Sequence, residues 1–336
     1  MSDLPGDRPA ALTPEVRAAI RALEVDRATA DAVRRLRASA IPSVVLKGPS
    51  HARWLYDDPN DRPYDDCDLL VPERSAREAE SALAEIGFVR RGFESVVEDR
   101  PRYGYPLYRA DDIAVDLHLT FVGVGAPPAR LWDVLAARTT SITVAGVEVD
   151  VLEPTARTLV LALHAAKDGG KRRGRGAKAI RDLELAIERV PSDVWREAAA
   201  LAADLDAVEA FAAGIRRVAP GERLAADLEL PDRLRPDVAL RLEQPPPLAV
   251  GVDWLLHGDD DGRGPRGVVG RARVVLRKVF PPPSHLRAWS PLARRGRLGL
   301  ALAYVGRPFW VAWRAIPAML AVRRARRLAA RDRGRS

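Results

Sequence analysis

The 336-residue chain is 47% hydrophobic and 30% charged, and it contains one cysteine, Cys67. This length allows one large domain or two of ordinary size, and the composition is that of a soluble globular protein with a sizeable core. A single cysteine excludes a disulfide framework and a four-cysteine zinc site. Because the first residues also lack the basic start and apolar stretch of a signal peptide, we expect a cytoplasmic protein.

The formal net charge of +8 is distributed unevenly along the chain. Residues 263–336 contain 19 Lys and Arg and one acid, which gives this region a net charge of +18. The preceding 262 residues contain 35 basic and 45 acidic side chains, for a net charge of −10. A basic region of this kind favours an anionic partner, such as nucleic acid or the inner face of a membrane.

The most apolar part of this basic region runs from Leu298 to Val322. It is interrupted by Arg307, Pro308, Arg314 and Pro317, so its charge-free segments are shorter than the ~18 residues of a membrane span. Arg307 and Arg314 are seven residues apart and therefore share one helical face. The pattern predicts an amphipathic helix lying on a surface, either lipid or the body of this protein.

The N-terminal part of the chain alternates helical and extended patterns. The sequence Thr13-Pro14-Glu15 is a helix start signal, and Ser75 with Glu78 forms the pattern of a capping box. We predict helices over Thr13–Ala38, Ser50–Tyr56 and Ser75–Ile86, a loop over Asp57–Asp65, and strands over Ser43–Leu46, Cys67–Val71, Phe88–Arg91, Leu107–Arg109, Ile113–Leu119, Ser141–Val144 and Val147–Leu152.

The pattern becomes helical after Leu152. Helices are predicted over Thr155–Ala166, Ala177–Glu188, Asp193–Ala203 and Ala207–Val218, with exposed connectors over Gln244–Pro247 and Gly258–Gly270. We therefore predict an α/β domain over residues 1–152 that includes the helical segment 13–38, a helical domain over 153–262, and a basic, Pro/Arg-rich region with an amphipathic helix over 263–336.

Asp66 and Asp68 flank Cys67 on one predicted strand, and Asp116 lies on another. Side chains alternate along a strand, so the first two carboxylates point the same way while Cys67 faces the core. Neighbouring carboxylates repel unless a cation neutralises them, and oxygen ligands suit Mg²⁺ or Mn²⁺. Asp116, which shares its face with His118, adds a third carboxylate, and the three carboxylates predict a metal site for phosphoryl chemistry, in which Asp116 acts as a base or metal ligand.

A strand that ends at Lys47 and Gly48 precedes a short helix containing Ser50. Glycine allows the backbone to approach a phosphate closely, and the start of a helix presents N–H groups to an anion. Lys47, Gly48 and Ser50 are therefore candidate nucleotide-binding residues. There is no Walker A sequence and no Rossmann glycine fingerprint in the chain.

These motifs resemble those of a family of uncharacterised bacterial nucleotidyltransferases within the polymerase-β-like superfamily. The resemblance is close over residues 43–120 and includes a later Asp-Leu-His element at Asp116. One departure is Pro49, which separates Gly48 from Ser50. The matching residues are Leu46-Lys47-Gly48, Leu55-Tyr56, Asp58-Pro59, Arg62, Asp66-Cys67-Asp68-Leu69-Leu70-Val71 and Val115-Asp116-Leu117-His118, followed by weaker matches at His164, Lys167, Asp182 and Phe280-Pro281-Pro282-Pro283.

The resemblance implies an α+β fold, with a polymerase-β-like nucleotidyltransferase domain whose mixed sheet is flanked by helices and a mostly helical C-terminal domain. It also implies a Mg²⁺-dependent enzyme that transfers a nucleoside monophosphate (NMP) from a nucleoside triphosphate (NTP) to an acceptor, with Asp66, Asp68 and Asp116 as catalytic and metal-binding residues. Two alternatives remain open. One is a non-catalytic protein that docks on membrane or nucleic acid, and the other is a toxin-type enzyme that acts on tRNA.

Several residues also have structural interpretations. Asp116 has Arg109 as an alternative ion-pair partner, and Arg62 is expected to pair with the neighbouring acids of its loop rather than with a phosphate. His118 and His164 are expected in the core or behind the site. The segment Gly169–Gly176 is expected to be a loop, with a phosphate-rich ligand as its alternative.

Overall fold

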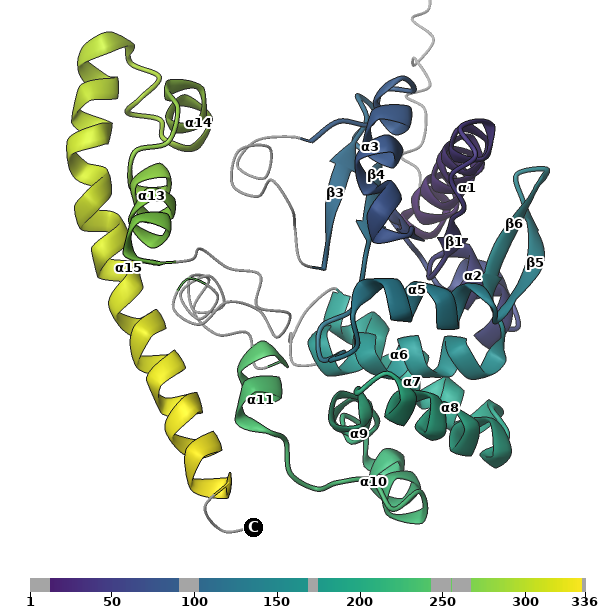
Figure 1. Cartoon of the computed structure of the whole chain (residues 1–336). Coiled ribbons are helices and arrows are strands. Elements are labelled where there is room, and N and C mark those ends of the chain that lie inside the picture. Colours follow the sequence, from purple (N-terminus) through teal and green to yellow (C-terminus); the bar gives the residue numbers. More distant parts are fainter. Residues whose placement is uncertain (1–12, 91–102, 169–174, 243–254, 256–266, 334–336) are drawn as a thin grey trace, which may run out of the picture.

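The computed structural model describes residues 13–90, 103–168, 175–242, 255 and 267–333 (Figure 1). Its centre is a six-stranded sheet in the order β3-β4-β2-β1-β6-β5. The pairs β2–β4 and β1–β6 are parallel and the other pairs are antiparallel, so the sheet is mixed, as expected. The strands are β1 (Val44–Val45), β2 (Asp66–Leu70), β3 (Gly104–Tyr108), β4 (Ala114–His118), β5 (Thr139–Val144) and β6 (Val147–Leu152).

Helices flank this sheet. The first begins where the sequence predicts, since the Thr13 hydroxyl accepts a hydrogen bond from the Val16 amide at 3.3 Å. The prediction of a capping box at Ser75 is wrong. The chain enters the helix over Ala76–Ala84 through a 3₁₀ turn, and this leaves Ser75 without the extended backbone that an N-cap needs. The helices are α1 (Pro14–Ala38), α2 (Pro49–Leu55), α3 (Ala76–Ala84) and α5 (Pro128–Ala136), with 3₁₀ turns η1 (Pro59–Asp61) and η2 (Glu73–Ser75).

After β6 the described chain is helical. The first of these helices, α6, is buried along almost its whole length, and α7, α8 and α9 pack around it. The bounds are α6 (Pro154–Asp168), α7 (Arg175–Arg189), α8 (Ser192–Asp204), α9 (Val208–Ile215), α10 (Ala219–Asp227) and α11 (Pro236–Leu242). Within Gly169–Gly176, residues 169–174 lie outside the described residues, and α7 begins at Arg175.

The sheet separates two apolar cores, and this division positions the polar side chains. In β4, Val115 and Leu117 join the core formed with α1 and α3. Because strand side chains alternate, Asp116 and His118 lie on the opposite face, toward α6 and the helices around it. Cys67 is fully buried in the core formed with α1 and α3, as predicted. Its neighbour Asp68 therefore points to the opposite face of the sheet, toward α6.

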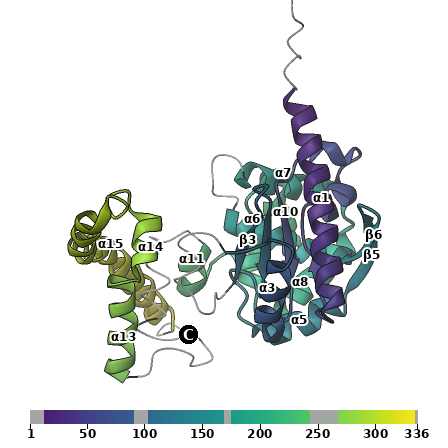
Figure 2. The same ribbon diagram turned by 90° about the horizontal axis from the view of Figure 1, so that it is seen from above.

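The C-terminal residues form α13 (Gly267–Val279), α14 (Pro283–Trp289) and α15 (Gly296–Arg333), beside the body of the molecule (Figure 2). The predicted amphipathic segment lies inside α15, which continues through Pro308 and Pro317. The predicted connector Gly258–Gly270 is too long, because α13 begins at Gly267; the connector Gln244–Pro247 lies outside the described residues. Over the described residues, every helix is too short or too polar to cross a membrane.

Candidate functional site

Three potential ligands gather on the face of β2 and β4 that is turned toward the helices. The parallel pairing of the two strands sets Asp68 opposite Asp116 and Asp66 opposite Ala114. Among the described residues, one group of potential ligand atoms lies within 4.8 Å of one another, and it is contributed by Asp68, Asp116 and His118. Asp66 lies one strand repeat away on the same face and is not part of that group.

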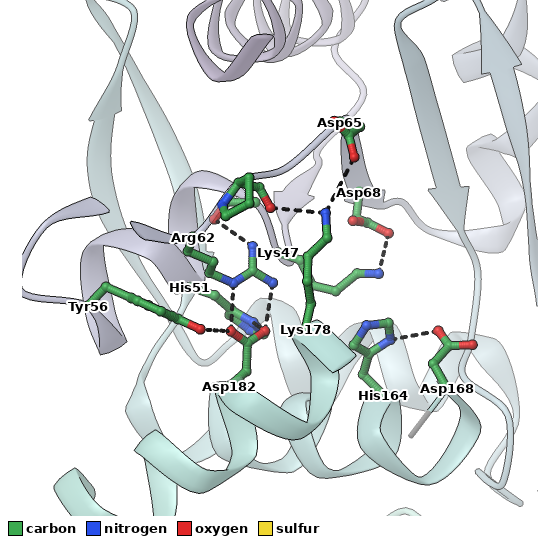
Figure 3. Close-up of polar contacts among 12 residues, drawn as sticks. Lys47, His51, Tyr56, Arg62, Asp65, Asp68, His164, Asp168, Lys178 and Asp182 are labelled. Atoms are coloured by element: carbon green, nitrogen blue, oxygen red, sulfur yellow. Dashed lines mark hydrogen bonds and ion pairs between the residues drawn. The ribbon is translucent and has the colours of Figure 1, made fainter. Parts of the chain in front are cut away.

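The Asp68 carboxylate is the centre of this cluster and is almost fully buried. Its Oδ1 lies 2.8 Å from the Lys47 ammonium nitrogen (Figure 3) and 2.8 Å from the His118 Nε2. Burial by itself would raise the pKa of Asp68, but the Lys47 ammonium and the His118 ring hold that pKa well below its usual range. Asp68 is therefore a permanently charged group that needs a cation beside it.

Lys47 follows β1, next to β2 in the sheet, and the Leu46 amide donates to the Asp68 carbonyl at 2.9 Å. Burial alone would lower the pKa of the Lys47 ammonium, yet the charges of Asp68 and Asp66 raise that pKa above its ordinary value. Lys47 thus provides positive charge at the position where carboxylates converge. The sequence singled out Lys47 for a phosphate, whereas its contact in the structure is a carboxylate.

Asp116 has the opposite electrostatic character. Burial, and then the neighbouring charge of Asp68, raise the pKa of Asp116 from 3.8 to about 6. Its alternative partner, Arg109, forms ion pairs with Asp111 at 2.8 Å and Asp31 at 3.7 Å. A carboxylate that is costly to ionise, beside one that stays ionised, is an arrangement suited to proton transfer and to cation binding.

We expect the Asp116→Asn variant to be more stable than the wild type above pH 6 when no metal is present. The folded protein binds the Asp116 proton more tightly than the unfolded chain does, so wild-type stability falls as the pH rises from about 4 to about 6. Asparagine has no charge to bury, so the variant should gain about 1–3 kcal/mol in free energy of unfolding over the wild type at pH 8. This gain should vanish near pH 4.

Urea unfolding of both proteins across this pH range, in a chelating buffer, measures the difference. Asp65→Asn is a suitable control, since Asp65 is exposed and pairs with Lys178 at 3.4 Å. A variant that is less stable than the wild type at pH 8 would contradict the assignment of a penalised carboxylate at Asp116.

Gly48 and Ser50 lie at the turn between β1 and α2. Gly48 has a φ of 62° and a ψ of −116°, a conformation that side-chain-bearing residues avoid. The Ser50 side chain is 1% exposed, and its hydroxyl has no hydrogen-bond partner among the described residues. The Ser50 amide already donates to the Lys47 carbonyl at 3.3 Å. The Ser50 amide is therefore already used within the turn, whereas the buried hydroxyl is not.

Arg62 joins the loop before β2 to the helical part of the chain. Its guanidinium forms two hydrogen bonds with Asp182 of α7, at 2.8 and 2.7 Å (Figure 3). Tyr56 donates to the same carboxylate at 2.9 Å, and the His51 Nδ1 lies 3.7 Å from it. The expected pairing of Arg62 with its neighbouring acids is thus corrected, because the partner is 120 residues away in the sequence.

The cluster around Arg62 and Asp182 is charged but buried away from solvent. Arg62 and Asp182 are 5% and 1% exposed, and burial alone would raise the pKa of Asp182, but the His51 ring and the Arg62 guanidinium hold that pKa below its ordinary value. Burial lowers the pKa of His51 to about 4, so this ring is neutral at physiological pH. The cluster holds α7 against the loop that leads into β2.

The helical part of the chain supplies further polar groups near Lys47. His164 and Asp168, one turn apart on α6, form a 3.3 Å contact, and Lys178 of α7 donates to the Pro63 carbonyl at 3.0 Å (Figure 3). Burial and the charge of Lys47 lower the pKa of His164 well below its ordinary value. The carboxylate cluster is consequently bordered by the sheet on one side and by α6 and α7 on the other.

The structure brings together three residues that the sequence singled out, Lys47, Asp68 and Asp116, and adds His118. The two-residue spacing of Asp116 and His118 placed the histidine on the correct face, but it gave no indication of the direct contact with Asp68. No sequence signal connected Arg62 with Asp182, since only tertiary packing brings them into contact.

The profile of a protein family described as uncharacterised nucleotidyltransferase matches residues 5–219, more than half of the chain. No curated protein matches the sequence. Among solved structures, the antibiotic-resistance factor ANT(2'')-Ia is 17% identical, with 57% of this chain and 94% of that chain covered and a TM-score of 0.36. A nucleotidyltransferase-like protein from Paracoccidioides brasiliensis is 18% identical, with 56% and 92% covered and a TM-score of 0.31.

Proposed function

Since the chain belongs to the family of uncharacterised nucleotidyltransferases, we propose that it transfers an NMP from an NTP to an acceptor hydroxyl or phosphate. The acceptor oxygen forms a bond to the α-phosphorus while the bond from that phosphorus to the β-bridging oxygen breaks, and pyrophosphate leaves. The observation that carries this proposal is the pair of carboxylates, Asp68 and Asp116, set opposite each other on adjacent parallel strands.

The donor set fits a divalent metal ion. Two carboxylates with ligand atoms within 4.8 Å of each other, and Asp66 on the same face, provide the oxygen ligands that Mg²⁺ or Mn²⁺ prefers. Bound there, the metal would neutralise charge on the phosphates and act as a Lewis acid. His118 contacts Asp68 at 2.8 Å and would hold that carboxylate in one orientation.

The remaining roles follow from charge and position. Asp116, set opposite Asp68 on the adjacent strand, would help to hold the metal and accept the proton of an acceptor hydroxyl. Lys47 would exchange its contact with Asp68 for the triphosphate when a metal–NTP complex enters. The unpartnered Ser50 hydroxyl would donate to a phosphate oxygen, beside the close backbone approach that Gly48 permits. We place the acceptor on the side of the carboxylate cluster where α6 and α7 carry His164, Asp168 and Lys178.

The Gly48→Ala variant is expected to lose about 1–3 kcal/mol of stability, because its φ of 62° strains any side-chain-bearing residue. The added Cβ would approach Tyr64 Cδ2 to 3.4 Å, which leaves room for a folded protein. We expect the Mg–NTP complex that the wild type binds to bind at least about tenfold more weakly, since the turn no longer holds the phosphate-binding groups in place.

Gly146→Ala is the matched control, because Gly146 has a φ of 77° and lies in the β5–β6 turn with open space around it. That variant should be destabilised by strain and bind the same Mg–NTP complex like the wild type. Equal nucleotide affinity in the two variants would remove Gly48 from the proposed binding site.

Calorimetric titration of each Mg–NTP into the purified protein tests the proposed function at its first step. We expect micromolar to millimolar binding of at least one NTP that requires the metal and is lost in Asp66→Asn/Asp68→Asn. Equal heats from the wild type and the double variant would refute this assignment of the nucleotide site.

A further inference from the structure

The outer face of α15 carries a continuous apolar strip. Its large hydrophobic side chains are 52–79% exposed and recur every three or four residues, so at 3.6 residues per turn they fall on one side of the helix. The opposite side is packed, since Ala303 joins a small core with Leu286 and Ala293 and the Tyr304 hydroxyl donates to the Pro281 carbonyl. The strip consists of Leu298, Leu302, Val305, Phe309, Trp313, Ile316 and Leu320.

Positive charge continues this face toward the C-terminus. The same helical spacing beyond Leu320 leads to Arg323, Arg324 and Arg327, all of them exposed. The two arginines within the strip's length, Arg307 and Arg314, point elsewhere and lie over the Trp310 ring at 5.5 and 4.7 Å from its centroid. The apolar strip is therefore free of charge along its length and ends in a basic cluster.

A lipid surface with anionic headgroups fits this combination. Apolar side chains enter the boundary between headgroups and acyl chains, tryptophan and phenylalanine are suited to that depth, and arginines attract the anionic headgroups. A second copy is a poorer partner, because it would bring together two regions of net charge +18. Nucleic acid would engage the arginines but leave the apolar strip in water.

We propose that α15 lies flat on an anionic membrane surface, with the face from Leu298 to Leu320 inserted and Arg323, Arg324 and Arg327 against the headgroups. The helix does not cross the bilayer, in accord with its interruption by charged residues and prolines. This docking is independent of the nucleotidyl transfer proposed above, since the strip and the carboxylate cluster share no residues.

Flotation of the full-length protein with vesicles tests the proposal. We expect the protein to float with phosphatidylcholine–phosphatidylglycerol vesicles and to remain behind with pure phosphatidylcholine. Phe309→Ser/Trp313→Ser should reduce binding at least about tenfold, because it removes two inserted apolar side chains without changing the charge. Arg323→Gln/Arg324→Gln/Arg327→Gln should weaken binding and reduce its dependence on salt.

Ile20→Ser/Leu23→Ser is the matched control, because it removes two large side chains that are 42% and 65% exposed on α1. This variant should float like the wild type. The proposal is overturned if the Phe309/Trp313 variant floats equally well, if the wild type binds RNA but no vesicles, or if those two substitutions dissociate a dimer while the wild type ignores lipid. No nucleotide is present in the test, so an inactive carboxylate site leaves its outcome unchanged.

Discussion

Asp68→Asn should reduce nucleotidyl transfer by on the order of 10³-fold or more, because it removes one of the anionic oxygen ligands that would hold the metal ion beside the triphosphate. Asp68 is 1% exposed and in contact with both Lys47 and His118, so its carboxylate is held in place opposite Asp116. The measurement is pyrophosphate release from Mg–NTP in the presence of a cell extract that supplies the acceptor.

Two further variants separate this effect from a loss of fold. Asp61→Asn changes an exposed carboxylate in the loop before β2 and should alter transfer by less than about twofold. Lys47→Gln/Asp68→Asn also removes the buried positive charge that loses its direct ion-pair partner in Asp68→Asn, and it should recover stability without recovering activity. Transfer within tenfold of the wild type in Asp68→Asn would contradict a role for this residue in the chemistry.

Arg62→Met should destabilise the protein by about 3–5 kcal/mol, because it leaves the Asp182 carboxylate buried without its main counter-charge. The double variant Arg62→Met/Asp182→Leu should recover much of this loss, since neither charge then remains in the interior. Urea unfolding of the wild type, the single variants and the double variant gives the coupling energy.

The pH dependence of this pair has a definite sign. The pKa of Asp182 is lower in the folded protein, so the pair's stabilisation is complete above the ordinary carboxyl pKa of about 4 and is lost only as the pH falls further. Arg130→Met is the control, because the Arg130–Asp204 pair is 54% and 46% exposed and should contribute about 0–1 kcal/mol. If Arg62→Met and Arg130→Met lose a similar amount of unfolding free energy, the buried pair does not have a special role in holding α7 to the loop before β2.

The sequence was sufficient to predict the residues that carry strong local signals. Apolar residues in strand-like runs predicted β4, β5 and β6 to within a residue or two at each end. Alternation along β2 and β4 predicted that Cys67 faces the core and that Asp116 shares a face with His118. The family motif at Asp66–Val71 predicted membership in the nucleotidyltransferase family, which the match to residues 5–219 confirms.

Other features depend on tertiary contacts that no local pattern encodes. Gly104 and Pro106 obscured the first half of β3, although pairing with β4 makes that segment a regular strand. Lys47 contacts Asp68 because β1 and β2 are adjacent in the sheet, and Arg62 reaches Asp182 only after α7 folds back onto the loop. Ser75 and Glu78 have the sequence pattern of a capping box. In the structure the 3₁₀ turn η2 leads into α3, and the Ser75 side chain makes no capping hydrogen bond.

Isotopic labelling of the NTP tests the central claim most directly. The wild-type protein is incubated with metal, a cell extract and an NTP that carries label on either the α- or the γ-phosphorus, and the labelled products are separated. NMP transfer predicts that α-label enters a new compound while γ-label appears in pyrophosphate, and that both products are missing with Asp68→Asn. Movement of γ-label into the acceptor, or the same products from Asp68→Asn as from the wild type, would contradict the account.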